Sequence, residues 1–420
     1  MEFYRIQGGR RLQGAVRLQG AKNSALPILA ATVAAGGKSV LHHCPQLTDI
    51  DATVAMLRHI GCRVTQDGET VTVDASAADS WEIPEHLMRE MRSSIIFLGA
   101  LIARFGRATV TQPGGCDIGL RPINLHLSAL QAMGVRVEES GGQIRCSAPD
   151  GVRAAELPLA LPSVGATENI LLAALCAQGE TVIRNAAREP EIGDLASFLR
   201  ACGADITGDG ESTVRIRGGR ALHDAAFTIM PDRIAAATYM VCAACTGGSI
   251  EIAPVIPEHL SPVLPVFREA GCDVRLQGQT LCMTAPARLT RVRSVQTMPY
   301  PGFPTDAQAV VMAMLATAQG TSVITEKVFE NRFHHIPELR KMGADIRTAD
   351  CGVAVIEGVP RLHGAAVTAS DLRGGSALVA AALGAEGETT VARIAHIDRG
   401  CERFAQVLRG LGADIEREQE

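Results

Sequence analysis

Aromatic side chains are scarce in this sequence. Phe, Trp and Tyr make up 3% of the 420 residues, although hydrophobic residues of all kinds make up 47%. An interior of this size cannot rest on aromatic packing, so we expect a core of Leu, Ile, Val, Ala and Met. The length favours two domains or more, and the 42 glycines indicate many tight turns.

Concentrated positive charge is also absent. The formal net charge is −5 and no long run of Lys or Arg occurs, which argues against nucleic-acid binding. The longest apolar stretches, such as residues 234–245, stop well short of the roughly 20 residues that span a membrane. The first residues, MEFYRIQGGRR, are not followed by the apolar segment of a signal peptide. We therefore expect a cytoplasmic protein without a membrane partner.

Clustered metal ligands are lacking as well. The 12 cysteines are scattered, several of them inside apolar runs, and without an export signal they are interpreted as reduced thiols. Cys242 and Cys245 form a CxxC with no second CxxC and no neighbouring His, which favours a packing role. His334 and His335 are adjacent, but no carboxylate stands at helical ligand spacing. We predict no metal site.

What the sequence does contain is a sixfold repeat. A helical segment is followed by Gly, any residue, Arg or Asp, and then Val or Ile. The repeated glycines are Gly61, Gly134, Gly203, Gly271, Gly343 and Gly412, at intervals of 73, 69, 68, 72 and 69 residues. Such spacing indicates stacked supersecondary units, each of which must bury one face against its neighbours.

The expected order of elements is the same in each unit. A helix ends at a glycine, as at Gly179, Gly320 and Gly387, and a short β-branched strand follows it. A second helix and two further strands come next. The order α-β-α-β-β predicts a protein of the α/β class.

The sixth unit ends soon after Gly412 without its closing strand. Residues 2–20 resemble the segment that precedes the sixth unit, VAVIEGVPRLHGAAVTASD, so we expect residues 1–21 to complete the C-terminal domain. The predicted domains, of three units each, are residues 22–230, and residues 1–21 together with residues 231–420. Their strands would wrap around packed helices.

The helices that open the units begin with unusual residues. Lys22–Asn23, Arg92 and Arg373 place cations at helix N-termini, where free N–H groups and the helix dipole favour anions instead. Such a local conflict is typical of a functional site. The openings of two other units carry Ser163–Gly165 and Asp306.

The loops before the second helices add further polar groups. Paired glycines in the loop 113–122, PGGCDIGLRP, let the backbone approach a ligand closely. Cys116 is flanked there by polar residues, so its thiol is predicted to be accessible and reactive. A cluster of cations in a cleft between the domains would suit a small, highly charged anion, with Cys116 and Asp306 supplying proton transfers. The cations are Lys22, Arg92, Arg121, Arg373 and Arg399.

Several longer segments resemble one known family. They include GAKNSALPILAA, PGGCDIGLRPINLH, PSVGATENILLAA, GFPTDAQA, ENRFHHIPELRKMGADI, DLRGGSALV and HIDRGCERF, and the similarity extends from Gly20 to Ile415. Together they resemble the enolpyruvyl transferases, in particular those that act on UDP-N-acetylglucosamine. The resemblance implies two inside-out α/β barrels of three units each, with helices inside and sheets outside, and an active site in the cleft between them.

The resemblance also implies a reaction. The 3′-hydroxyl of UDP-N-acetylglucosamine attacks C2 of phosphoenolpyruvate while C3 is protonated, and loss of phosphate from the tetrahedral intermediate leaves an enolpyruvyl ether. In this family the reaction is the first committed step of peptidoglycan synthesis. It implies two small-molecule substrates and neither a metal nor an organic cofactor.

Residue roles follow from the resemblance position by position. Lys22, Arg121 and Arg399 would hold the phosphate of phosphoenolpyruvate. Cys116 matches the cysteine linked to protonation at C3 and to product release, which fosfomycin alkylates in this family. Asp306 matches the carboxylate that contacts the attacking hydroxyl and serves as general base in at least one half of the cycle. The complete phosphoenolpyruvate set is Lys22, Asn23, Arg92, Arg121, Arg373 and Arg399. The UDP-N-acetylglucosamine set is Asn23, Arg92, Arg121, Pro122, Ile123, Asn124, Leu125, Ser163, Val164, Gly165, Asp306 and Val328.

Three positions depart from the family pattern. Asn124 stands where many members have Asp, Leu161 where some have Lys, and Cys401 where Tyr is frequent. None of these changes removes a predicted catalytic group, so they bear on affinity.

Two alternatives remain open at this stage. A 5-enolpyruvylshikimate-3-phosphate synthase shares the fold and the chemistry. Such an enzyme usually has a lysine-serine pair where this chain has GAKN, and it lacks the PGGC loop that this chain has. A non-catalytic UDP-sugar-binding homologue would not need the combination of Lys22, Cys116, Asp306 and Arg399. The oligomeric state is not predicted.

Overall fold

The computed structural model describes the whole chain except residues 1, 115–117, 120–121, 351 and 420. Its contacts divide the chain into two compact units. Residues 20–230 form the N-terminal unit, apart from Ile118 and Gly119, which group with the other unit. Residues 2–19 and 231–419 form the C-terminal unit, so the chain passes twice between the units.

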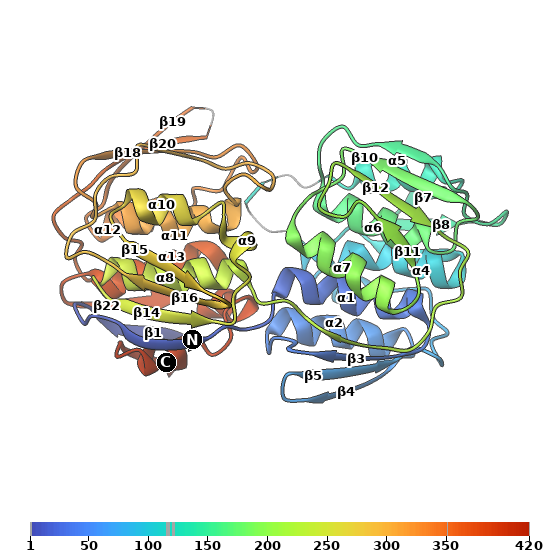
Figure 1. Cartoon of the computed structure of the whole chain (residues 1–420), viewed down its shortest axis with the longest axis horizontal. Helices are drawn as coiled ribbons and strands as arrows, with labels where there is room; N and C mark the ends of the chain where they lie inside the picture. Colours follow the sequence, from blue (N-terminus) through green and yellow to red (C-terminus); the bar gives the residue numbers. More distant parts are fainter. Residues whose placement is uncertain (1, 115–117, 120–121, 351, 420) are drawn as a thin grey trace. The chain divides into compact units, whose positions relative to one another are not determined.

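Each unit is built around three buried helices. They are α1 (Lys22–Ala35), α4 (Phe97–Phe105) and α6 (Val164–Ala174) in the N-terminal unit, and α8 (Arg233–Cys245), α11 (Thr305–Leu315) and α13 (Leu372–Gly384) in the C-terminal unit. Helix α4 packs against α1 and α6, whereas α8, α11 and α13 all pack against one another (Figure 1). These helices are apolar on most sides, and such a helix is stable only in a protein interior.

A second set of helices is shorter or only partly buried. The second helices of the six repeats are α2 (Thr48–His59), α5 (Asn124–Ala132), α7 (Pro190–Ala201), α10 (Leu264–Glu269), α12 (Ile336–Lys341) and α14 (Phe404–Gly410). Single turns complete the set: α3 (Glu85–Met88), α9 (Pro257–Leu260) and the 3₁₀ helices η1 (Arg92–Ile96) and η2 (Ile394–Arg399).

Three small sheets cover the helices of the N-terminal unit. The first has the order β13 (Ala225–Thr228), β3 (Lys38–His42), β5 (Thr70–Asp74), β4 (Arg63–Asp67). The second is β6 (Arg107–Thr111), β8 (Gln143–Ser147), β7 (Arg136–Ser140). The third is β11 (Asp205–Thr207), β12 (Thr213–Arg217), β10 (Glu180–Arg184), β9 (Glu156–Pro158).

The C-terminal unit has three sheets of the same kind. The first is β15 (Asp273–Gln277), β16 (Thr280–Thr284), β14 (Ser249–Ala253), β2 (Gln13–Arg17). The second is β17 (Ser294–Gln296), β18 (Thr321–Thr325), β20 (Val353–Glu357), β19 (Asp345–Ala349). The third is β21 (Ala366–Thr368), β22 (Glu388–Ala392), β1 (Glu2–Gln7), β23 (Asp414–Gln419).

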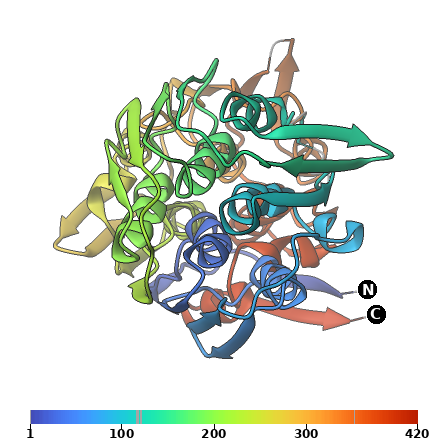
Figure 2. The ribbon, with the colours of Figure 1, turned by 90° about the vertical axis from the view of Figure 1, so that its right-hand side faces the viewer.

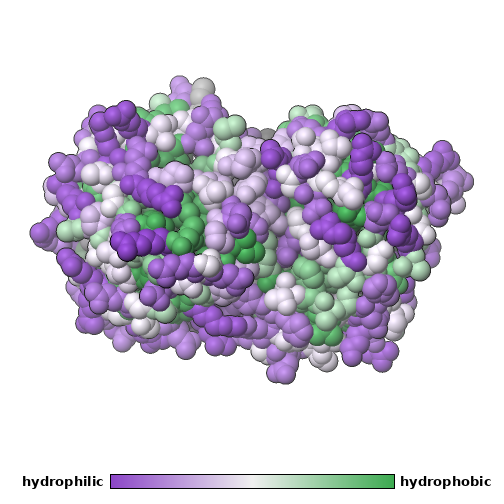
Figure 3. All heavy atoms as spheres, viewed as in Figure 1, coloured by the Kyte–Doolittle hydropathy of each residue, from purple (hydrophilic) through white to green (hydrophobic). Residues whose placement is uncertain are grey.

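The predicted order of elements is confirmed, for example by the succession α11, β18, α12, β19, β20. Side chains alternate along the strands: in β12, Val214 and Ile216 are buried, whereas Arg215 and Arg217 are exposed. Hydrophilic side chains accordingly cover much of the surface that Figure 3 shows. Each unit is therefore an inside-out α/β barrel, with helices at the centre and sheets around them (Figure 1).

The N-terminal strand completes the last sheet, as the sequence predicted. β1 lies between β22 and β23 and is antiparallel to both, with Phe3 opposite Ala392 on one side and Glu418 on the other. The two ends of the chain consequently lie side by side (Figure 2).

Each crossing of the chain between the units comes shortly after a strand. β2 precedes α1 of the N-terminal unit, yet it pairs in parallel with β14 of the C-terminal unit. β13 precedes α8 of the C-terminal unit, yet it pairs in parallel with β3 of the N-terminal unit. Each crossing of the chain thus leaves its strand in the sheet of the unit that the chain is leaving.

A backbone requirement explains the repeated glycine. All six repeat glycines follow a second helix and have φ between 85° and 100°. This left-handed conformation is open to glycine and strained for most other residues. It lets the chain leave the helix and start the next strand at once.

The CxxC lies in the core, as predicted. Cys242 is fully buried in α8, and burial raises the pKa of its thiol, with a further contribution from Cys245. None of the helices in the described part of the chain has the length and apolar character needed to cross a bilayer.

Candidate functional site

The predicted residues of the N-terminal unit stand at the starts of its helices. Lys22 begins α1, Arg92 begins η1, Asn124 begins α5 and Val164 begins α6. Helix η1 packs against α1 and α6, and α5 packs against α6. These helix starts therefore belong to one packed group.

Lys22 is held by a carboxylate that the sequence did not single out. Its Nζ lies 2.7 Å from Oδ2 of Asp49 in the first turn of α2, and Asp49 is buried. The ion pair explains how a cation is tolerated at the start of α1, where the helix dipole opposes it. In the sequence, the only sign of this partner is an acidic residue near a helix start.

The first turn of α1 is also tied to the end of the N-terminal unit. The hydroxyl of Ser24 and the backbone N–H of Met230 both donate to Oδ2 of Asp194, the latter over 3.2 Å. The carbonyl of Met230 in turn accepts from the N–H of Ala21 over 2.7 Å. Burial raises the pKa of Asp194 to about 6, although the bonds from Ser24 and Met230 oppose the shift. Asp194 thus anchors the segment that carries Lys22 and Asn23.

One buried amide joins the other helix starts. Oδ1 of Asn169 in α6 accepts from the N–H of Gly99 over 2.6 Å, and its Nδ2 donates to the carbonyl of Ile95 over 3.1 Å. The same Nδ2 lies 2.8 Å from Nδ1 of His126. Because an N–H group can donate only to the amide oxygen, the orientation of Asn169 is assigned, and Nδ1 of His126 accepts.

His126 is consequently a neutral ring with its hydrogen on Nε2. Burial, reinforced by the positive charge of Arg92, lowers the pKa of His126 to about 4. The ring lies against the start of α6, where a Cβ added to Gly165 would come within 3.0 Å of Cε1. The absence of a side chain at Gly165 therefore lets α5 and α6 approach closely.

Ser163 is the N-cap of α6. Its side chain accepts from the N–H of Ala166 over 3.3 Å, which gives it a structural role of its own. Leu161, two residues earlier, is exposed.

Two predicted residues, Cys116 and Arg121, lie outside the described residues. The flanking parts of their loop are described. Nη1 of Arg92 donates to the carbonyl of Pro113 over 3.5 Å. The carbonyl of Ile118 accepts from the N–H of Asn331 over 3.0 Å, within the C-terminal unit to which Ile118 is assigned.

Asp306, at the start of α11, is the centre of the site residues in the C-terminal unit. Nη2 of Arg332 lies 2.7 Å from its Oδ1, and Nη2 of Arg373 lies 2.9 Å from its Oδ2. The two arginines are only 4% and 5% exposed, so they fix the carboxylate firmly. Each carboxylate oxygen has a second lone pair and can also accept a hydrogen bond from a substrate hydroxyl.

The sequence analysis did not single out Arg332 as a site residue, although Arg332 lies in one of the segments that carry the family resemblance, ENRFHHIPELRKMGADI. Besides binding Asp306, its Nη2 donates to the carbonyl of Thr305 over 3.3 Å. Nothing in the spacing of the sequence indicated that this arginine, 26 residues further along, would meet Asp306.

Arg373 lies in the first turn of α13, and the side chain of Asp371 caps the N-terminus of this helix. Oδ1 of Asp371 accepts from the N–H groups of Arg373 and Gly374, over 2.9 and 3.1 Å. Although burial opposes it, the bond from Gly374 and the charge of Arg332 lower the pKa of Asp371. The cap and the bond to Asp306 together resolve the conflict between Arg373 and the helix dipole.

Arg399 is the last residue of η2, and the loop after it is clamped. Nε2 of Gln19 donates to the carbonyl of Gly400 over 3.1 Å. Oε1 of Gln19 accepts from the N–H of Glu402 over 2.8 Å. A side chain from the N-terminal segment therefore holds both ends of the turn that follows Arg399.

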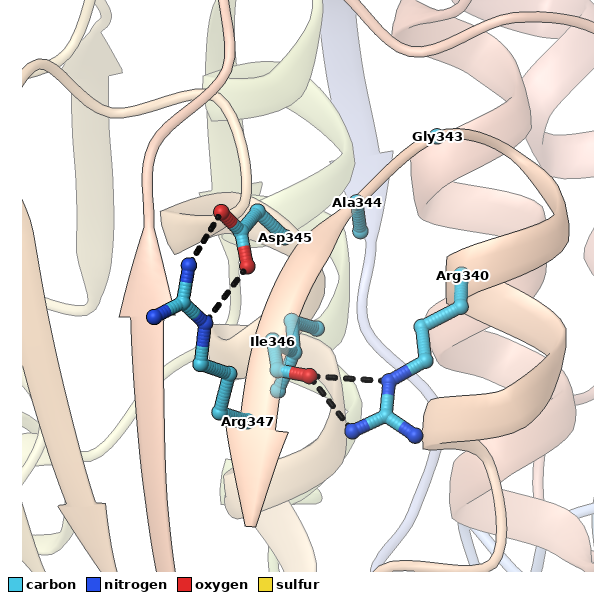
Figure 4. A pocket seen from close by; sticks show the side chains of 6 residues that line it. All are labelled: Arg340, Gly343, Ala344, Asp345, Ile346 and Arg347. Atoms are coloured by element: carbon cyan, nitrogen blue, oxygen red, sulfur yellow. Dashed lines mark hydrogen bonds and ion pairs between the residues drawn. The ribbon is translucent and has the colours of Figure 1, made fainter.

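A shallow depression elsewhere on the C-terminal unit contains no predicted site residue (Figure 4). It is lined by Arg340, Gly343, Ala344, Asp345, Ile346 and Arg347. Equivalent arginine-to-carbonyl bonds occur in three repeats, from Arg58 to Val64, from Arg200 to Ile206 and from Arg340 to Ile346. The arginine-to-carbonyl bond at this depression is thus a recurring structural feature and does not indicate a binding site.

Comparisons with known proteins place the chain in a family. The EPSP synthase (3-phosphoshikimate 1-carboxyvinyltransferase) family matches residues 6–408. The chain is 52% identical over 414 residues to UDP-N-acetylglucosamine 1-carboxyvinyltransferase 2 of Caldanaerobacter subterraneus subsp. tengcongensis, and the match covers 99% of both chains. It is 48% identical over 421 residues to UDP-N-acetylglucosamine 1-carboxyvinyltransferase 1 of Symbiobacterium thermophilum, covering 99% of this chain and 95% of the relative.

Solved structures show the same fold. The enolpyruvyl transferase NikO from Streptomyces tendae superposes with a TM-score of 0.90 at 28% identity, covering 100% of this chain and 99% of that one. EPSP synthase from Acinetobacter baumannii superposes with a TM-score of 0.78 at 20% identity over the full length of both chains, which shows the fold alone. With a family match along most of its length and relatives about half identical end to end, the chain belongs to the enolpyruvyl transferase family, among the UDP-N-acetylglucosamine 1-carboxyvinyltransferases.

Proposed function

We propose that this protein transfers the enolpyruvyl group of phosphoenolpyruvate to the 3′-hydroxyl of UDP-N-acetylglucosamine and releases phosphate. The observation that carries the proposal is the 52% identity, over 99% of both chains, to a relative of that name. The arrangement of Asp306 between Arg332 and Arg373 supports it, because a fixed carboxylate at a helix start suits contact with a substrate hydroxyl.

The proposed reaction has two steps. In the first, the 3′-oxygen bonds to C2 of phosphoenolpyruvate and loses its proton, while C3 gains a proton and becomes a methyl group. In the second, the C2–O bond to phosphate breaks and C3 gives up a proton, which restores the double bond. Asp306 is assigned to the proton of the hydroxyl and Cys116 to the proton at C3.

The cations are assigned to the phosphate group. Lys22, Arg121 and Arg399 would bind it directly, with Arg92 and Arg373 nearby. Charge builds up on the phosphate as it leaves, and each preorganised cation typically contributes several kcal/mol to such a transition state. Since the N-terminal unit carries Lys22 and the C-terminal unit carries Asp306 and Arg399, we propose that one active site draws residues from both units.

The remaining assignments belong to the same proposal. Asn23, Pro122–Leu125, Ser163–Gly165 and Val328 would contact UDP-N-acetylglucosamine. The reaction would take place in the cytoplasm, as part of peptidoglycan synthesis, and would need no metal ion or organic cofactor.

The test is release of phosphate from phosphoenolpyruvate by the purified protein without added metal. Parallel reactions contain UDP-N-acetylglucosamine or shikimate 3-phosphate as the acceptor. We expect phosphate, and an enolpyruvyl product by mass, only with the UDP-sugar. Release only with shikimate 3-phosphate would overturn the acceptor, and a folded protein that binds the UDP-sugar without turnover would be a non-catalytic binder.

A further inference from the structure

A buried glutamate ties together three segments of the C-terminal unit. Glu326 directly follows β18 and is only 5% exposed. Its Oε1 accepts from the hydroxyl of Thr297 over 2.7 Å and from the N–H groups of Val328 and Phe329 over 2.8 and 3.1 Å. Its Oε2 accepts from the hydroxyl of Thr305 over 2.9 Å. The carboxylate therefore receives four hydrogen bonds.

These bonds reach Val328, which is assigned to the substrate, and Thr305, the neighbour of the assigned residue Asp306. Thr305 is the first residue of α11 and immediately precedes Asp306. Its carbonyl accepts from Arg332, so the residue is held from two sides, by Glu326 and by Arg332. Val328, whose N–H Glu326 holds, is 38% exposed, although large hydrophobic side chains in the described part of the chain are mostly buried.

Thr297 closes the network from the third segment. It is fully buried just after β17, its hydroxyl accepts from the N–H of Lys327 over 2.9 Å, and its own N–H donates to the carbonyl of Thr325 over 2.9 Å. The next residue, Met298, is exposed to 50%. Thr297 and Glu326 are thus buried, whereas Met298 and Val328, close to them in the chain, have exposed apolar side chains.

The network explains why a carboxylate occupies this position. Burying a charge is costly unless hydrogen bonds compensate for the lost water. A carboxylate can accept from four donors at once, as Glu326 does, and so fixes the relative positions of all the groups that donate to it. An apolar side chain would fill the space but would leave the two N–H groups and the two hydroxyls without this acceptor.

We propose that Glu326 is a positioning residue for the sugar-nucleotide site, which sets Asp306 through Thr305 and Val328 through its backbone N–H. This inference rests on the proposed function, because Asp306 and Val328 are assigned there to UDP-N-acetylglucosamine. Glu326 itself touches no reacting atom. Its effect is to fix the position of the Asp306 carboxylate relative to the side chain of Val328, which is assigned to the sugar.

The first test removes the hydrogen bond from Thr305 to Glu326 with Thr305→Val and restores it with Thr305→Ser. We expect Thr305→Val to lower kcat/KM for UDP-N-acetylglucosamine by roughly tenfold to a hundredfold, as small displacements of catalytic groups do, while KM for phosphoenolpyruvate stays at the wild-type value. Thr305→Ser should recover most of the loss. Thr321→Val is the matched control, because Thr321 donates to Glu357 over 2.6 Å in the same sheet, away from the site.

A second test needs no turnover. Hydrogen exchange at the amides of Val328 and Phe329 is measured in Glu326→Gln and Glu326→Ala, together with the melting temperature and the affinity for UDP-N-acetylglucosamine. We expect faster exchange and weaker binding in Glu326→Ala, and an intermediate result in Glu326→Gln, which keeps one acceptor oxygen. Thr305→Val should weaken binding without accelerating exchange at these amides.

Two outcomes would overturn the inference. One is a Thr305→Val variant that behaves like Thr321→Val. The other is a loss of kcat/KM that is equal for both substrates, parallels the fall in melting temperature and is not recovered in Thr305→Ser. That pattern would mean a purely structural role. Failure of the proposed function is a different result: the wild type would show no turnover with UDP-N-acetylglucosamine, while the exchange and binding measurements would still decide the role of Glu326.

Discussion

The two units arrange opposite charges differently at the residues assigned to the site. In the N-terminal unit, the cation Lys22 is paired with a buried carboxylate, Asp49. In the C-terminal unit, the carboxylate Asp306 is held by two buried arginines, Arg332 and Arg373. The first arrangement pairs a cation with a carboxylate, whereas the second places two guanidinium groups on one carboxylate. The carboxylate of Asp306 is therefore held at both of its oxygens.

The largest effect is expected at Asp306. Asp306→Ala should lower kcat by roughly 10² to 10⁴, the usual contribution of a general acid or base. It should also destabilise the fold by about 3–5 kcal/mol, because two buried guanidinium groups lose their shared partner. Steady-state kinetics and denaturant unfolding measure the two effects. Loss of activity with unchanged stability would contradict the view that Asp306 neutralises the arginines.

A smaller loss of stability is expected at Asp49. Asp49→Asn removes the carboxylate that is paired with the mostly buried ammonium group of Lys22, and it should destabilise the protein by about 2–4 kcal/mol. The double variant Asp49→Asn with Lys22→Met also removes the ammonium group and should be more stable than Asp49→Asn, while remaining inactive. Unfolding in denaturant compares the two. If Asp49→Asn costs as much stability as Asp306→Ala, the contrast between the units fails.

Each unit also contains a buried neutral histidine, which makes stability depend on pH. Burial and Arg92 lower the pKa of His126 to about 4, and burial lowers the pKa of His335 as well. In the unfolded chain these histidines bind protons near pH 6.5. Their contribution to the free energy of unfolding should therefore be fully present above that pH and decrease as the pH is lowered towards 4. For His126 alone the loss is roughly 3 kcal/mol.

The contribution of each unit can be separated by substitution. We expect His126→Gln to flatten the dependence of the unfolding free energy on pH between about 6.5 and 4, and His335→Gln to do the same independently. An unchanged slope in His126→Gln would mean that the ring is protonated in the native state.

The smallest effect is expected at Gln19, which clamps the turn after Arg399. Gln19→Ala should raise KM for phosphoenolpyruvate by roughly tenfold, through displacement of Arg399. Gln19→Glu keeps the acceptor for the N–H of Glu402 and loses the donor to Gly400, so its effect should be weaker. Gln277→Ala, at an exposed position of β15, is the control. Equal KM values in all three variants would show that Arg399 does not depend on the clamp.

The sequence indicated the positions that require a particular backbone conformation. The six repeat glycines, all with φ between 85° and 100°, mark positions where other residues are strained. Their spacing predicted six units, and the truncated sixth unit predicted the role of β1. The parallel partners of β2 and β13, which are β14 and β3, were not predicted, because the local pattern of a strand does not identify its neighbours in the sheet.

The sequence by itself thus determined the repeat, the class of fold and, through its resemblance to known enzymes, which side chains to consider. Only the tertiary structure decided how those side chains are held. Asp306 meets Arg332 and Arg373 across 26 and 67 residues, and Gln19 reaches Gly400 across 381. Periodicity and helix caps act within a few residues, so they leave a trace in the sequence. Contacts between distant side chains arise only when packed helices and sheets bring them together, and no local pattern records them.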